Sequence, residues 1–96
     1  ESSWYGYMLA DTFPTVWHYN HGYQHITTYF NETNLATYFY IYDYKLGSWL
    51  YTTSTLYPHL YNYKLGTWTW YQKDSGNGVD LKRWFYNYAT QAWFND

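Results

Sequence analysis

The sequence predicts an all-β fold, an antiparallel meander of about nine short strands built from four tandem β-hairpin repeats. Aromatic residues make up 29% of the 96 residues, and Tyr alone occurs 16 times. Bulky aromatic side chains favour extended strands over helices. Only 12% of the residues are charged, which is about half the usual share. The length fits one domain spanning residues 1–96.

The repeat is clearest in the middle of the chain. Residues 38–49 and 57–68 align without a gap and share the pattern Tyr-x-Tyr-Lys-Leu-Gly-(Ser/Thr)-Trp. Residues 13–22 form an earlier copy that keeps the proline and the glycine of 57–68. A more divergent copy follows at 83–93, with Gln91 in place of the glycine. The copies start near positions 13, 38, 57 and 82, so their spacings are 25, 19 and 25 residues.

Each copy is expected to form a hairpin. Along 38–44 the tyrosines at even positions project to one face, and Phe39 and Ile41 project to the other. A type I turn closed by a glycine in the left-handed region fits the Lys-Leu-Gly segment, because glycine has no Cβ to clash there. The turn glycines are Gly22, Gly47 and Gly66. The six additional residues of the longer spacings fall in polar stretches around 30–34 and 74–78, which we expect to be loops.

Stacking the copies in register places equivalent residues in rows. One repeat position forms a continuous apolar ridge, the repeat core, made of Val16, Ile41, Leu60 and Phe85. The opposite face carries an aromatic ladder of Trp17, Tyr42, Trp49, Tyr61, Trp68, Trp70, Trp84 and Tyr86. Residues 3–9 look like a lone half-hairpin. The pattern leaves an open sheet, a small barrel and a solenoid-like winding as alternatives.

Residues 46–51, 56–61 and 83–88 resemble an aromatic-rich repeat region of secreted bacterial proteins, often found near their C-termini. The resemblance covers most of the chain, and no function comes with it. A looser similarity is to the choline-binding cell-wall repeats, which also use short Trp/Tyr hairpins. Those repeats carry several glycines per unit and this chain mostly one, so no choline site is transferred.

Catalytic chemistry is not expected. The seven acidic residues fall in loops, at the termini or, for Asp43, at a strand end that Asn62 and His18 occupy in other copies, so no carboxylate pair for polysaccharide cleavage is evident. His18, His21 and His25 are more simply hairpin residues than zinc ligands. The loop 74–80 lacks the regular acid spacing of a calcium loop. We therefore expect no cofactor and no metal.

The charge and the short apolar runs argue against two classes of partner, nucleic acids and membranes. The net charge is −2, and the five basic residues form no stripe for a nucleic acid backbone. No apolar run is long enough to span a membrane. The chain starts at Glu1 without Met, so we expect a removed secretory leader or an excerpt of a longer protein, and an extracellular location. Asn31-Glu-Thr33 matches the N-glycosylation pattern in a predicted loop.

Two functions fit these features. The first is a self-assembling subunit of an extracellular filament, sheath or surface layer, a homopolymer joined through uncharged terminal strands. Its assembly edges are Trp4, Tyr5, Tyr7, Trp93 and Phe94. The alternative is a module that binds glycans or cell wall on exposed Tyr and Trp platforms. A binding module keeps its aromatic faces open, whereas an assembly subunit buries them on its neighbours.

Overall fold

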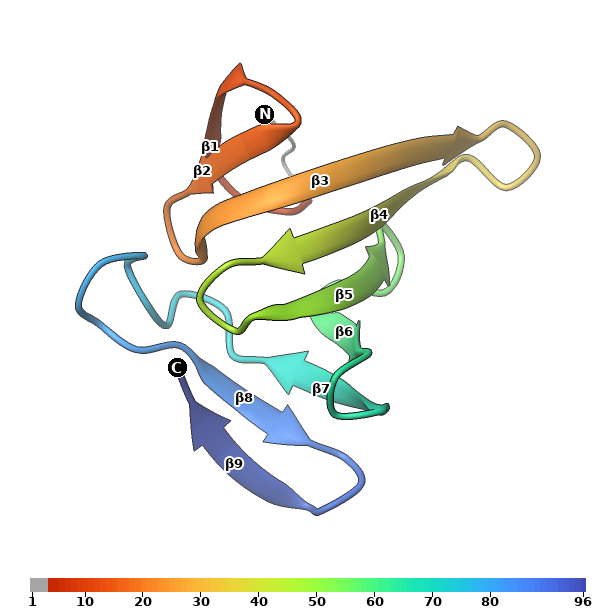
Figure 1. Ribbon diagram of the computed structural model, residues 1–96. Helices are drawn as coiled ribbons and strands as arrows, with labels where there is room; N and C mark the ends of the chain where they lie inside the picture. Colours follow the sequence, from red (N-terminus) through yellow and green to blue (C-terminus); the bar gives the residue numbers. More distant parts are fainter. Residues whose placement is uncertain (1–3) are drawn as a thin grey trace.

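The computed structural model describes residues 4–96, and over these residues the chain is all-β (Figure 1). The strands are β1 (Met8–Thr12), β2 (Thr15–His18), β3 (Gly22–Asn31), β4 (Ala36–Asp43), β5 (Ser48–Thr53), β6 (His59–Asn62), β7 (Thr67–Tyr71), β8 (Trp84–Asn87) and β9 (Ala92–Asn95). They form one antiparallel sheet in the order β1 to β9, so every strand pairs with the next along the chain. The predicted meander is confirmed, as an open sheet rather than a barrel. Within the described residues, no helix is long and apolar enough to cross a membrane.

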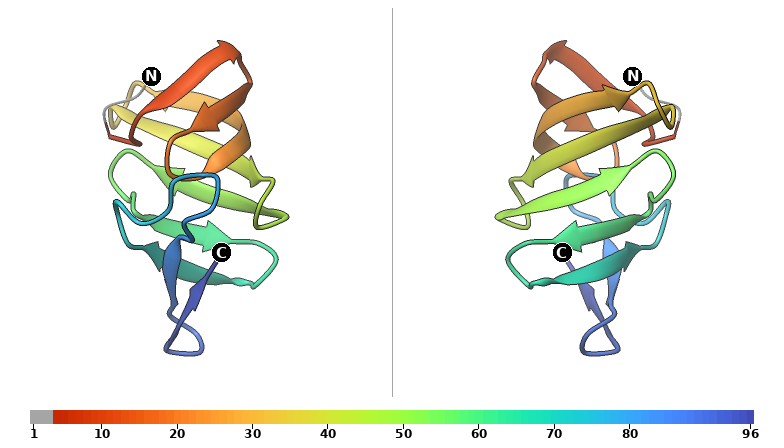
Figure 2. Two further views of the ribbon diagram at one scale, coloured as in Figure 1. Left: turned by 90° about the vertical axis from the view of Figure 1, so that its left-hand side faces the viewer. Right: turned by 90° about the vertical axis from the view of Figure 1, so that its right-hand side faces the viewer.

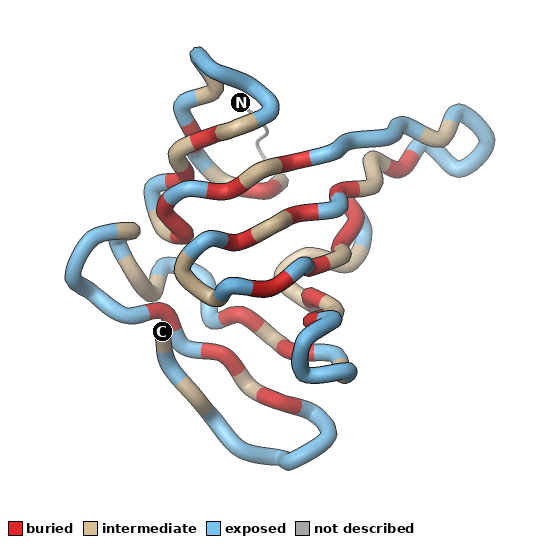
Figure 3. Tube along the Cα trace, in the orientation of Figure 1, coloured by how far each residue is buried: buried red, intermediate tan, exposed pale blue. Residues whose placement is uncertain are grey.

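The sheet is strongly twisted. The strand direction rotates progressively from β3 to β9, so the sheet coils around its own inner face (Figure 2). Buried and exposed residues alternate along the strands (Figure 3). The linker 72–83 between β7 and β8 runs back to the turn between β2 and β3, where Asn20 Nδ2 donates to the carbonyl oxygen of Gly76 at 3.2 Å.

The core lies on the inner face and draws on every hairpin. The predicted repeat core, Val16, Ile41, Leu60 and Phe85, is at most 1% exposed and belongs to one cluster. The other buried members are Tyr5, Met8, Ile26, Phe39, Leu50 and Tyr71. Each of β1 to β8 thus contributes an inward apolar side chain, and Phe94 of β9 packs at the margin. The alternation of the strands places these side chains on one side of the sheet.

The hairpin turns repeat one geometry. In the second copy Tyr42 pairs with Trp49 and Asp43 with Ser48, which leaves four residues in the turn. Gly47 and Gly66 have φ of 65° and 69°, the left-handed region that glycine adopts without strain. Gln91 adopts the same conformation with φ 57°, so the fourth copy keeps the turn without its glycine. The first copy pairs His18 directly with Gly22 and is one residue shorter.

The N-terminal segment departs from the expected half-hairpin at 3–9, of which residue 3 lies outside the described residues. Strand β1 begins only at Met8, and it pairs with β2. Tyr5 is 1% exposed, and its ring lies 5.3 Å from that of Phe39 and 4.9 Å from that of Tyr57. Trp4 and Tyr5 therefore fill the inner face instead of forming an edge. A single sheet has no second layer, so other segments must cover its apolar side.

Candidate functional site

One repeat position brings a polar side chain into the core. His18, Asp43, Asn62 and Asn87 end the first strand of their hairpins and are all buried. Each accepts hydrogen bonds from backbone N–H groups of its turn. Asn62 Oδ1 accepts from the amides of residues 64 and 65 at 3.0 Å, and His18 Nδ1 accepts from those of residues 20 and 21 at 3.0 and 3.2 Å. The turn therefore needs an acceptor here, although the position faces the core.

In the second copy this acceptor is the carboxylate Asp43, and Arg83 neutralises it. Arg83 Nη1 lies 2.6 Å from Oδ2 and Nη2 lies 3.0 Å from Oδ1, a bidentate pair between two side chains that are 0% exposed. Gln24 Nε2 donates to Oδ2 at 2.8 Å, and the backbone N–H of Leu46 donates to Oδ1 at 2.9 Å. These four hydrogen bonds satisfy the buried carboxylate.

Asp43 ends β4 as the sequence analysis placed it, but its burial and the role of Arg83 were missed. The alternation of β4 carried a signal, because Asp43 lies two residues after Ile41 and so faces the same side. Nothing local marked Arg83 as its partner, since 40 residues separate the two.

Arg83 also sets the direction of a hydrogen-bond chain. Its Nη1 lies 2.9 Å from His21 Nδ1, and a guanidinium only donates, so Nδ1 accepts. Burial lowers the pKa of His21 well below its ordinary value, and nearby His18 and Arg83 lower it further. The neutral ring therefore carries its hydrogen on Nε2, which donates to Tyr57 Oη at 3.0 Å. The hydroxyl hydrogen of Tyr57 is left to point elsewhere.

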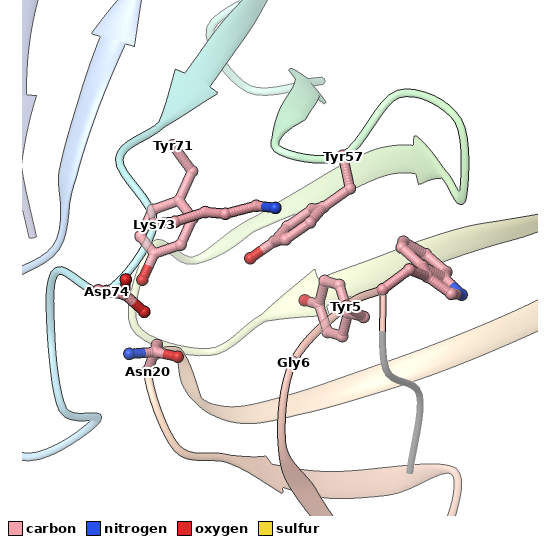
Figure 4. A pocket seen from close by; sticks show the side chains of 8 residues that line it. Tyr5, Gly6, Asn20, Tyr57, Tyr71, Lys73 and Asp74 are labelled. Atoms are coloured by element: carbon pink, nitrogen blue, oxygen red, sulfur yellow. The ribbon is translucent and has the colours of Figure 1, made fainter.

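A pocket of about 150 Å³ lies beside this chain (Figure 4). Its walls come from three distant segments: the N-terminal segment, the β2–β3 turn, and residues 57–74 around β6 and β7. Its lining includes Trp4, Asn20, Tyr57, Tyr71, Lys73 and Asp74. Asp74 adopts φ 70°, a left-handed conformation that Asp and Asn tolerate better than most residues. The pocket is hereafter the inner pocket.

The outer face carries the aromatic ladder as repeated pairs. Each hairpin places two rings opposite each other across the strands, with ring centroids 4.9–5.5 Å apart and planes at 67–75°. The pairs are Trp17–Tyr23, Tyr42–Trp49, Tyr61–Trp68 and Tyr86–Trp93. Edge-to-face contacts of this kind stabilise a pair beyond its buried area by about 0.5–1.5 kcal/mol. The strands thus hold the outer rings in fixed orientations.

A shallow hollow interrupts this face. Tyr40, Trp49 and Tyr63 line an open space of about 500 Å³ and are 43%, 46% and 51% exposed. Beside it a row of aromatic residues crosses β4 to β7 in register, made of Tyr40, Tyr51, Tyr61 and Trp68. The described residues that line the hollow are all uncharged. It is hereafter the aromatic hollow.

The remaining predicted residues are dispersed. Trp70 and Trp84 lie on the outer faces of β7 and β8. Of the five predicted edge residues, Trp93 is exposed on β9, whereas Phe94 points inward and stacks on Phe85 at 5.2 Å. Tyr7 precedes β1 and stacks on Tyr19 at 4.7 Å. The proposed edge residues therefore form no common surface.

The three histidines singled out in the sequence do not all lie together, and Asn31 lies apart from them. The rings of His18 and His21 pack 4.4 Å apart inside the core, where His18 Nε2 donates to the carbonyl oxygen of Tyr5 at 2.9 Å. His25 lies on the outer side of β3. Asn31 ends β3 at the tip of the long β3–β4 hairpin, where its Oδ1 accepts from the backbone amides of residues 33 and 34. The tip projects beyond the other strands (Figure 1).

Comparison with protein-family models, curated proteins and solved structures finds no match to this chain.

We expect Arg83→Met to destabilise the protein by about 3–5 kcal/mol, because it leaves the carboxylate of Asp43 buried without a counter-ion. Adding Asp43→Asn should recover part of this loss, since Asn62 and Asn87 cap the equivalent turns. Denaturant unfolding of the single and double variants measures the coupling, expected at roughly 1–3 kcal/mol. Strictly additive losses would contradict the pair as described.

Acid should unfold the protein through its buried histidines. Burial lowers the pKa of His18 to about 4, while in the unfolded chain it is about 6.5. Between these two pKa values the unfolded state binds a proton and the folded state does not. The free energy of unfolding therefore decreases as the pH is lowered, by up to about 1.4 kcal/mol per pH unit for each such histidine. His18→Asn keeps the turn acceptor but cannot titrate. Unfolding free energies at pH 7 and pH 5 should differ less in this variant, and an unchanged difference would exclude His18 as the cause.

Proposed function

We propose that the protein is a non-catalytic extracellular module that binds neutral glycans on its outer aromatic face. The observation that carries the proposal is the aromatic hollow, in which Tyr40, Trp49 and Tyr63 expose their rings together. Ligand sites in proteins are concave and lined mainly by apolar and aromatic side chains. The C–H face of a pyranose ring is apolar and flat, so it stacks on such rings and removes apolar surface from water.

The chemistry of the hollow favours an uncharged ligand. Its lining supplies no ammonium, guanidinium or carboxylate to pair with a charged group. Cross-strand packing holds Trp49 against Tyr42, with ring centroids 5.4 Å apart, so little side-chain freedom is lost on binding. The neighbouring row of rings from β4 to β7 extends the platform across strands about 4.8 Å apart. Several sugars of one chain can therefore stack at once, which raises avidity.

Trp49→Ala should weaken binding of a neutral oligosaccharide by about tenfold or more, because it removes one wall of the hollow. Trp84→Ala is the matched control: Trp84 is 43% exposed against 46% for Trp49, yet it lies outside the hollow. A glycan array identifies the ligand, and isothermal titration calorimetry then compares the variants. Equal losses in both variants, or no glycan bound by the wild type, would refute the proposal.

Self-assembly is a second candidate, favoured by the backbone of β9. Arg83 and Asp96 exchange both backbone hydrogen bonds at 2.9 Å, which sets the phase of the β8–β9 ladder. Antiparallel pairs alternate, so the backbone groups of Trp93 and Asn95 face away from β8. An uncharged edge of this kind can add a strand from another copy, and head-to-tail addition extends as a filament. In such a filament the partner of β9 is β1 of the next copy, and β1 carries Asp11 and a register irregularity, so assembly ranks second to glycan binding.

Asn95→Pro tests edge assembly, because proline removes one outward N–H and leaves the hydrogen bonds to β8 intact. We expect wild-type protein and the control Asn95→Ala to form polymers that grow with concentration in sedimentation velocity and electron microscopy. Asn95→Pro should remain monomeric. A monomeric wild type at all concentrations would end this candidate.

A further inference from the structure

The inner pocket lies on the opposite face of the sheet from the aromatic hollow. Tyr5 and Tyr71, which line it, point into the core, whereas Tyr40 and Trp49 point outward. The inner pocket and the aromatic hollow are therefore separate candidate sites. The pocket goes beyond the proposed function, and its chemistry differs from that of the hollow.

We propose that the inner pocket binds a single neutral pyranose ring, as presented by a monosaccharide or by the end of a glycan chain. Tyr57 would donate a hydrogen bond to one hydroxyl, and Asp74 would accept from a neighbouring one. The size fits this ligand: at about 30 Å³ per water, a pocket of about 150 Å³ corresponds to about five waters. One sugar ring displaces a group of that size, whereas an extended chain does not fit.

The donor comes from the hydrogen-bond chain of the core. Arg83 donates to His21, and His21 donates to Tyr57 Oη, so the Tyr57 hydroxyl must direct its own hydrogen away from His21. In Figure 4 this hydroxyl points into the space between Tyr5 and Tyr71. A chain that starts at a buried cation polarises each successive donor. The Tyr57 hydroxyl therefore has a hydrogen left to donate to a ligand in the pocket.

The acceptors lie on the far wall. Tyr71 donates its hydroxyl hydrogen to the carbonyl oxygen of Ser75, so its oxygen faces the pocket as an acceptor. The Asp74 carboxylate is an acceptor only, and among the described residues the ion pair within 4 Å is that of Arg83 with Asp43. Each sugar hydroxyl can both donate and accept a hydrogen bond. Two adjacent hydroxyls can therefore accept from Tyr57 on one wall of the pocket and donate to Tyr71 or Asp74 on the other. Trp4 supplies an apolar wall for the C–H face of the ring.

The charges of the pocket favour a ligand without net charge. Lys73 and Asp74 cancel in net charge, which gives no attraction for an anion or a cation alone. Lys73 Nζ lies 5.8 Å from the centroid of the Tyr57 ring, a cation–π contact that already engages the ammonium. A zwitterion would compete with this cation–π contact for the ammonium, while its carboxylate could accept from Tyr57 as a sugar hydroxyl does. The amino-acid probes of the test below therefore decide between the two ligand classes.

The pocket walls are also tied together before any ligand arrives. Asn20 in the β2–β3 turn donates to Gly76, and Tyr71 at the end of β7 donates to Ser75 in the linker. These contacts join the β2–β3 turn to the linker 72–83. A preformed site avoids part of the ordering cost of binding, which matters for a ligand with few contacts.

The test is titration calorimetry and saturation-transfer NMR with methyl pyranosides in the millimolar range, with glycine and alanine as zwitterionic probes. We expect one pyranoside to bind, with about tenfold weaker affinity in Tyr57→Phe, which removes only the hydroxyl. Asp74→Asn is the second variant, because Asn tolerates the left-handed backbone and keeps one acceptor oxygen. It should weaken binding even if Tyr57→Phe perturbs the fold, which circular dichroism would reveal.

Trp49→Ala separates this site from the proposed function. It should leave methyl pyranoside binding unchanged while it weakens oligosaccharide binding at the hollow. The inference is overturned by pyranoside binding that neither pocket variant changes, by absence of pyranoside binding, or by preferential binding of the amino acids. Oligosaccharide binding that survives such a result would still support the proposed function.

Discussion

The ion pair between Asp43 and Arg83 is the constraint on which the inner side of the fold depends. It originates in a local requirement, because the turn after β4 needs a buried acceptor and this copy supplies a charged one. A buried charge must be neutralised at close range, and Arg83 does so from the linker before β8. The pair thereby ties the middle of the sheet to its C-terminal part. The loop that carries Arg83 then lies against the first hairpin and forms a wall of the inner pocket.

Burial of such a pair does not stabilise a protein by itself, since desolvation offsets the attraction. Its effect here is geometric. The guanidinium fills a gap on the inner face and orients His21, which in turn orients Tyr57. Its Nε is a buried donor without a protein partner. The network therefore gives direction to hydrogen bonds rather than a large net free energy.

Large rings supply the cohesion that disulfides provide in many small domains. The chain has no Cys, and its single sheet lacks a second layer to bury an apolar face. Twist solves part of this problem, because a coiled sheet brings its inner side chains together (Figure 2). Tyr5 and Trp4 fill the remaining space from the N-terminal side. The outer rings pack edge to face across neighbouring strands and stay partly exposed.

Apart from β1, the sequence by itself determined the strands, their order and their two faces. Those features follow from contacts between residues close in the chain: the alternation of side chains, the turn glycines and the repeat that places Val16, Ile41, Leu60 and Phe85 in one row. Neighbouring strands pair with each other, so a local pattern was enough to predict the meander. The cross-strand register was different, because it depends on the turn length, and only the structure placed Tyr42 opposite Trp49.

Only the tertiary structure decided how the inner face is closed. Tyr5 left the predicted edge for the core, Arg83 reached Asp43 across 40 residues, and the linker met the first turn. No periodicity encodes these contacts, because each depends on how far the sheet twists and on the space left inside it. The inner pocket is lined by the N-terminal segment, the β2–β3 turn and residues around β6 and β7. Because these segments are distant in the sequence, the lining residues share no sequence motif.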